Sequence, residues 1–299
     1  MNRVIFFGRI HYKNKRSVNL AKAAYIRYND TIAKGDLLYR PDALFGDEEQ
    51  ILEEFEDLYL DFPRKSHDEV TDKTLAHTEQ GMATLLGYAM AGRVDMFVIT
   101  AGELPRQITG TVDNSKSAAQ YHVAGQEALE AGDFATAITE FTNSINSFAR
   151  NPWAHDGRAL AAYELSDLDA AEADFREARA QHPHLPSPHL GLAKIFARRE
   201  QYSAAMDSAK KAMDNSIPHQ PGYWITALFI TEVMMARLEK EMGQLSETEA
   251  DLYHKQVNSF LSRYEMKLKQ LGSNRTEHYP TPEAHAALVE RFEGLRAMA

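Results

Sequence analysis

The chain has 299 residues, enough for roughly two domains, and 44% of them are hydrophobic, which is typical of a packed protein. Its formal charge of −10 argues against nucleic-acid binding as the main activity, because phosphate attraction requires a basic surface. The absence of cysteine excludes a disulfide framework and a thiolate nucleophile. No membrane-spanning run or signal-peptide pattern is recognisable, so we expect a cytoplasmic protein without a membrane segment.

The first hundred residues contain alternating strand and helix signals. β-branched and aromatic runs indicate strands, and apolar residues at helical spacing indicate helices. The expected elements are a buried strand at 4–7 ended by Gly8, a helix at 18–32 capped by Asn14 or Ser17, a short strand at 37–39, a helix at 51–59 capped by Asp47, a helix at 68–91 closed by Gly92, and a strand at 95–100. This order favours a small α/β domain over residues 1–105, with parallel strands covered by crossover helices. The turn-rich residues 106–117 are expected to be a linker.

A basic loop follows the first expected strand and precedes a helix start. Free N–H groups at such a start attract anions. The candidate contacts are Arg9, Lys13, Lys15, Arg16 and Ser17. However, neither of the two glycine-rich nucleotide-binding fingerprints is present. The alternative is a solvated turn.

The pattern that organises the chain lies at residues 118–219, where small and large residues recur every 34 positions. Such self-similarity is the signature of a helical repeat array. One small column holds Ala137, Ala171 and Ala205, and a second holds Ser144, Ala178 and Ala212. Large residues three positions before the first column are Phe134, Leu168 and Tyr202. These columns predict two short helices per unit, because small residues let helices approach while the large residues fill the space between them.

The repeated pattern resembles the tetratricopeptide repeat. The matching positions are Tyr121, Gly125, Gly132, Asp133, Phe134, Ala137 and Phe141 in the first unit; Ala159, Tyr163, Asp167, Leu168, Ala171, Phe175, Ala178 and Pro183 in the second; and Leu192, Ala193, Phe196, Tyr202, Ala205 and Ala212 in the third. The departures include His155 and His189, each in place of a large apolar residue. The resemblance implies three repeats and a mainly α protein.

The resemblance also implies a concave groove, lined by the first helix of each unit, that receives an extended peptide or a partner helix. The residues expected to face it are His122, Gln126, Glu130, Trp153, Asp156, Leu160, Glu164, Ser187, Leu190, Lys194 and Arg198. Trp153 is a candidate anchor, and Lys194 with Arg198, one turn apart, could bind an acidic side chain. Relatives that clamp a terminal carboxylate do so with lysine, asparagine and arginine. The corresponding positions here hold His122, Gln126, Gly157, Ser187 and Gly191. None of these supplies a fixed positive charge, so that mode of binding is not expected.

Residues 220–299 are expected to form helices that cap the array. Apolar residues mark a helix at 223–242, the capping-box sequence from Ser246 to Glu249 opens another, and a last helix is expected at 282–296. They could fold back on the repeats or form a homodimer face.

Two other clusters are interpreted as structural. His182, His184 and His189 lie in a proline-rich stretch with no local carboxylate or thiolate to complete a metal site. The acidic face at 47–57 fits the solvated side of an amphipathic helix. The sequence predicts neither a metal nor a cofactor.

The sequence as a whole favours a scaffold or adaptor with a protein or peptide as its partner. No set of catalytic residues can be assigned from spacing. The competing interpretation is that the N-terminal α/β domain is an enzyme or a nucleotide or small-anion sensor that the repeats regulate or target.

Overall fold

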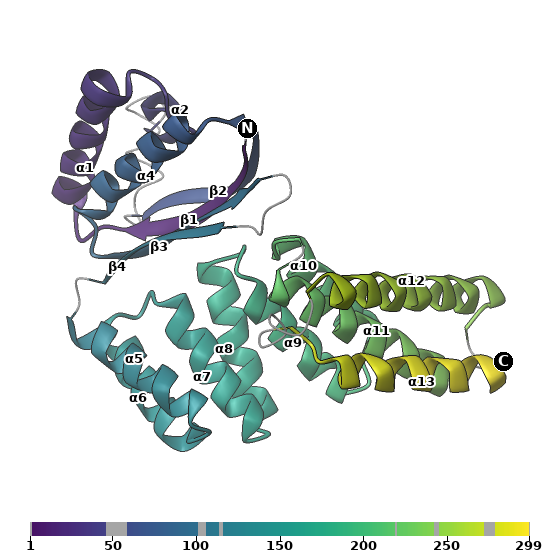
Figure 1. The fold of residues 1–299 in the computed structure, drawn as a ribbon. Helices are drawn as coiled ribbons and strands as arrows, with labels where there is room; N and C mark the ends of the chain where they lie inside the picture. Colours follow the sequence, from purple (N-terminus) through teal and green to yellow (C-terminus); the bar gives the residue numbers. More distant parts are fainter. Residues whose placement is uncertain are drawn as a thin grey trace. The chain divides into compact units, whose positions relative to one another are not determined.

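The structure is a computed structural model, and it describes residues 2–45, 59–100, 106–113, 116–218, 220–241, 245–271 and 279–298. Figure 1 traces its helices and strands. The contacts divide the chain into two compact units. The first contains Met1–Gly157 and Gln181–His184, and the second contains Arg158–Ala180 and Leu185–Ala299.

The first unit contains a four-stranded sheet. Its strands are β1 (Asn2–His11), β2 (Tyr59–Val70), β3 (Ala91–Ile99) and β4 (Arg106–Asp113), in the order β2-β1-β3-β4. Each neighbouring pair is antiparallel, as in the pairing of Phe6 with Lys65 and Met96. The expectation of parallel strands was therefore wrong. The buried strands at 4–7 and 95–100 are confirmed within β1 and β3, although β3 ends at Ile99.

One face of this sheet is covered by α1 (Lys15–Tyr28), the short π-helix η1 (Asn29–Ala33), α2 (Pro41–Phe45) and α4 (Asp72–Leu86) (Figure 1). The alternate β1 residues Val4, Phe6 and Ile10 point into this core and are fully buried. The carboxamide of Asn14 accepts the backbone N–H of Ser17 at 2.9 Å, so Asn14 is the N-cap of α1.

Several element predictions in this unit need correction. Residues 37–39 form no strand. Their apolar run reflects burial instead, because Leu37 and Tyr39 belong to the core of this unit. The helix expected at 68–91 is shorter, because its flanks belong to β2 and β3, and Gly92 lies inside β3. The expected linker contains β4, which pairs with β3. Asp47 and the acidic face at 47–57 lie outside the described residues, and Tyr59 begins β2.

The six repeat helices form as predicted. They are α5 (Lys116–Glu130), α6 (Phe134–Ser147), α7 (Pro152–Glu164), α8 (Leu168–Gln181), α9 (Pro186–Arg198) and α10 (Tyr202–Asn215). The turn inside each pair has the same form, because Gly132, Ser166 and Glu200 adopt φ values of 77°, 63° and 57°. The next residue donates its N–H to a carbonyl of the preceding helix in each case: Asp133 to Ala128, Asp167 to Ala162 and Gln201 to Phe196. This is the Schellman motif, repeated every 34 residues.

Consecutive repeats pack by placing an aromatic ring against a glycine. A Cβ on Gly157 of the second repeat would lie 2.3 Å from the ring of Phe141 in the first repeat. A Cβ on Gly191 of the third repeat would lie 2.2 Å from the ring of Phe175 in the second repeat. Each ring is fully buried, so the second helix of one repeat reaches the first helix of the next only where a side chain is missing.

Three further helices follow in the second unit. They are α11 (Pro221–Glu241), α12 (Glu247–Leu271) and α13 (Pro282–Met298), and they share one core with α9 and α10. Ser246 and Glu249 form the predicted capping box, with reciprocal backbone bonds at 3.2 and 3.3 Å. Trp224 and Tyr264 are buried in this core, so the helices pack on the last repeat. A dimer through them stays a prediction.

Candidate functional site

The predicted groove residues lie on the first helices of the repeats, but their side chains differ in availability. On α5, Gln126 and Glu130 are exposed, whereas His122 is half-buried, with its ring centroid 5.6 Å from that of Phe141. Burial lowers the pKa of His122, and the charge of Arg93 adds to this effect. A neutral imidazole packed on a core ring offers little to an anionic partner.

Trp153 and Asp156 at the start of α7 are also partly or largely buried within the first unit. The Trp153 ring meets the His182 ring edge to face, with centroids 5.8 Å apart. The indole Nε1 is buried and has no hydrogen-bond partner among the described residues. Asp156 is 9% exposed. Trp153 therefore contributes to packing, and its role as an anchor for a partner stays a prediction.

Of the predicted groove residues, the most available cations lie on α9, in the second unit. Arg198 is exposed, and its guanidinium lies 4.1 Å from the ring centroid of Tyr163 on α7. Lys194 is half-buried one turn earlier. Neither cation makes a salt bridge to any residue in the described ranges. Leu160, on α7, is half-buried.

An acidic residue of α11, Glu232, lies near one of these cations, Lys194. Partial burial raises the pKa of Glu232, whereas the charges of Arg291 and Lys194 counteract that rise. Sequence reasoning missed Glu232 because it lies beyond the repeats, and it missed the contact of Tyr163 with Arg198. The contact of Tyr163 with Arg198 could have been found from the 34-residue register, because the register puts both residues at the ends of the first helices of consecutive repeats.

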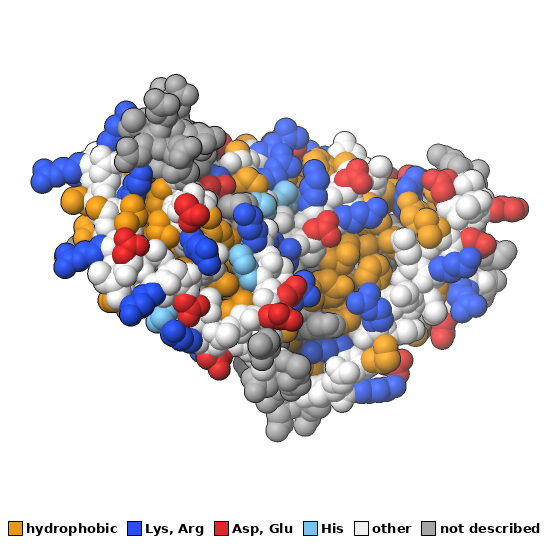
Figure 2. Space-filling view, turned by 90° about the horizontal axis from the view of Figure 1, so that it is seen from above, with side chains coloured by type: hydrophobic (Ala, Val, Ile, Leu, Met, Phe, Trp, Pro, Cys, Tyr) orange, Lys and Arg blue, Asp and Glu red, His pale blue; other side chains and the backbone are white. Residues whose placement is uncertain are grey.

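Charge is mixed on one face of the protein. On the face that Figure 2 shows, basic and acidic side chains are interspersed around patches of hydrophobic ones. This face therefore presents no broad basic field.

The basic residues of the N-terminal loop are only partly brought together. Lys13 and Ser17 line a pocket of about 510 Å³ with Tyr88, Met90 and Phe148. Lys15 and Arg16 are exposed and do not line it. Arg9 points elsewhere, donating to the Gln181 carbonyl and pairing with Asp61 at 3.2 Å.

Two of the three histidines of the proline-rich stretch, His182 and His189, are buried. His182 is 4% exposed and lies against Phe7 and Trp153. His189 is buried within α9. Within the described ranges, no group of three or more His, Asp or Glu residues is arranged to hold a metal ion. In those ranges, too, no helix is both long enough and apolar enough to cross a bilayer.

Comparison with known proteins gives structural likeness only, since no family model and no curated protein matches the sequence. The first TPR domain of Spaghetti, solved with an HSP90 peptide, is 17% identical, with a TM-score of 0.38 over 41% of this chain and 94% of its own. The Arabidopsis OM64 TPR domain is 18% identical, with a TM-score of 0.37 over 40% and 98%. MamA is 13% identical, with a TM-score of 0.41 over 61% and 91%.

These scores are low, so the assignment rests on the chain's own geometry. Three helix pairs recur at 34 residues, each with the same left-handed turn position, and glycine-to-phenylalanine contacts join consecutive pairs. The chain is thus a mainly α protein of the tetratricopeptide-repeat type, with a small N-terminal α/β region and C-terminal helices packed on the last repeat.

Proposed function

We propose that this protein is an interaction scaffold whose repeats bind an acidic segment of a partner protein, as an extended peptide or a helix, in the concave groove. The observation that carries the proposal is the open pair of cations on α9. Lys194 and Arg198 face the same side of the helix, one turn apart, without a salt bridge to a described residue.

The chemistry of the pair favours a carboxylate. A guanidinium offers a planar fork of donors that matches a carboxylate, and an ammonium one turn away can hold a second acidic side chain. The Tyr163 ring stabilises the Arg198 guanidinium by a cation–π contact. Because the chain as a whole is acidic, such a partner would be attracted by this local feature and not by the net charge.

Affinity capture with the full chain tests the proposal. The double variant Lys194→Glu with Arg198→Glu should lose its partner, because like charges then face the acidic segment. Its matched control is Lys210→Glu with Lys211→Glu, which reverses two exposed cations on the second helix α10 and should keep the partner. Equal capture by the two double variants would contradict groove binding.

A second candidate is a small-anion sensor in the N-terminal region. The 510 Å³ pocket supports it, because an ammonium and a hydroxyl share a lining with aromatic and apolar side chains. Calorimetry with nucleotides and polyphosphates should then show binding that Lys13→Ser weakens. Flat titrations with the intact protein would exclude this role.

A further inference from the structure

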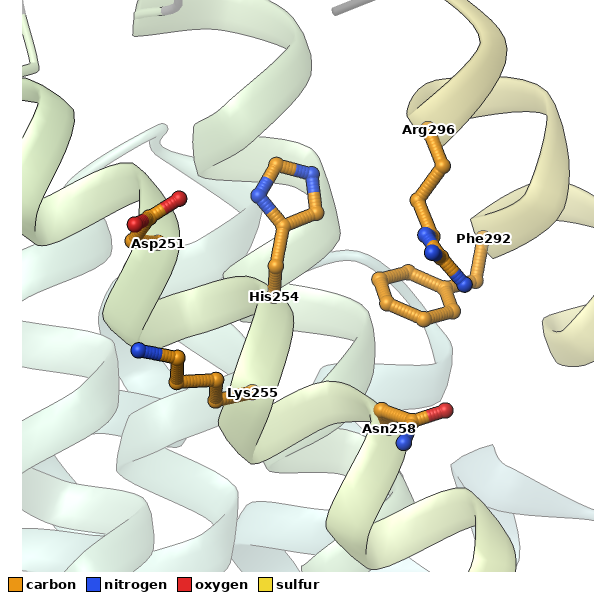
Figure 3. A pocket seen from close by; sticks show the side chains of 6 residues that line it. All are labelled: Asp251, His254, Lys255, Asn258, Phe292 and Arg296. Atoms are coloured by element: carbon orange, nitrogen blue, oxygen red, sulfur yellow. The ribbon is translucent and has the colours of Figure 1, made fainter.

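A pocket between α12 and α13 in the second unit is not used by the proposed scaffold function. Its volume is about 390 Å³, within the range of roughly 300–1,000 Å³ that accommodates small organic ligands. The lining residues are Asp251, His254, Lys255 and Asn258 of α12 with Phe292 and Arg296 of α13 (Figure 3). Residues of two successive helices thus line one pocket.

The floor of this pocket is apolar. Phe292 is 4% exposed and belongs to the core shared by α11, α12 and α13. The His254 ring stands beside it, with centroids 5.9 Å apart. An apolar body that entered the pocket would therefore contact the half-buried His254 ring and the small part of Phe292 that stays accessible.

The donors around the floor are available. The Arg296 guanidinium lies 6.0 Å from the Phe292 ring centroid and makes no salt bridge to a residue that the structure describes. Figure 3 shows the Phe292 ring between His254 and Asn258, with the Arg296 guanidinium next to it. The same view shows Lys255 extending away from the ring.

We propose that this pocket binds a small organic monocarboxylate. The Arg296 fork holds the carboxylate, and the apolar body lies against the His254 ring and the small accessible part of Phe292. A phosphate dianion fits less well, because Lys255 points away and Asp251 adds a negative charge to the lining.

Titration of the full-length protein with phenylacetate, followed by NMR or calorimetry, tests the site. Arg296→Gln should weaken binding about tenfold or more, since it removes the charged donor. Lys255→Gln is the matched control: it removes the same charge from the same pocket rim, on the side away from Phe292, and should change the affinity less than about twofold. Melting curves verify that both variants fold.

Two further ligands test whether the site requires both the carboxylate and the apolar body. Phenethyl alcohol, which keeps the ring and lacks the carboxylate, and inorganic phosphate should each bind more weakly than phenylacetate. Absence of phenylacetate binding, or equal loss in the two variants, would overturn the proposal. A pentapeptide ending in phenylalanine identifies the source: tighter binding than phenylacetate indicates a partner's chain end, and equal or weaker binding indicates a free acid.

Discussion

The backbone at Ser166 has a φ of 63°, in the left-handed region that a side chain normally avoids. The equivalent residue of the first repeat is Gly132, with a φ of 77°, and that of the third is Glu200. Three different residues therefore adopt the left-handed conformation in this turn, and only the glycine, Gly132, does so without a steric cost. The Schellman hydrogen bonds hold the other two in place.

Ser166→Gly should consequently stabilise the protein. Relief of the left-handed cost, partly offset by the greater freedom of glycine in the unfolded chain, predicts a gain of about 0.5–1 kcal/mol in the free energy of unfolding. Urea denaturation gives this quantity. The reciprocal change Gly132→Ser should lower it, and a destabilised Ser166→Gly protein would mean that the turn conformation is different.

Among the elements, the contact between repeats depends on the missing side chains of Gly157 and Gly191. An aromatic ring occupies the space that each leaves, and the two contacts are equivalent by the 34-residue register. Each ring therefore sets how closely the second helix of one repeat approaches the first helix of the next.

Gly191→Ala should cost about 1–3 kcal/mol of stability, because its methyl group would meet the Phe175 ring at 2.2 Å. Gly294→Ala is the matched control: it lies inside α13, where a new Cβ would meet no described heavy atom within 4 Å apart from its chain neighbours and its own helix backbone, and should gain about 1 kcal/mol from helix propensity. Thermal melting distinguishes the two. If both variants melted alike, the close packing of Phe175 on α9 would be refuted.

The elements also show what the sequence could predict. The repeat helices were predictable because three copies of one pattern constrain each other, as the column of Ala137, Ala171 and Ala205 illustrates. The antiparallel sheet was not, because β2 is an edge strand rich in charged residues and has no clear apolar run. The register also predicted Lys194 and Arg198 as groove residues, and that role stays a prediction. The contact of Trp153 with His182 did not follow from the register, because it depends on how the proline-rich turn folds back.

At the scale of the whole molecule, the first unit joins the sheet to the beginning of the repeats. The sheet face opposite α1 and α4 carries Phe7, Arg9 and His11. His182 contacts Phe7, and Phe148 contacts His11 edge to face at 5.9 Å. Both histidines are at most 5% exposed, so two titratable rings lie inside this contact.

These rings should make stability depend on pH. Burial, with the charge of Arg9 second, lowers the pKa of both His11 and His182 to about 4. The unfolded chain binds these protons near pH 6.5 and the folded chain only near pH 4. The stabilisation is therefore complete above about pH 6.5 and is lost as the pH falls towards 4.

Each ring should contribute about 2 kcal/mol to the loss of stability between pH 7.5 and 5.0, with some coupling between the two because they are neighbours. His182→Phe keeps the ring contacts and removes the titration, so its urea midpoint should fall less over this interval than that of the wild type. NMR titration of the His182 ring provides a direct check. Identical pH dependence of the two proteins, or a ring that titrates near pH 6.5, would show that His182 is not buried, and that the contact between the sheet and the repeats does not hold in solution.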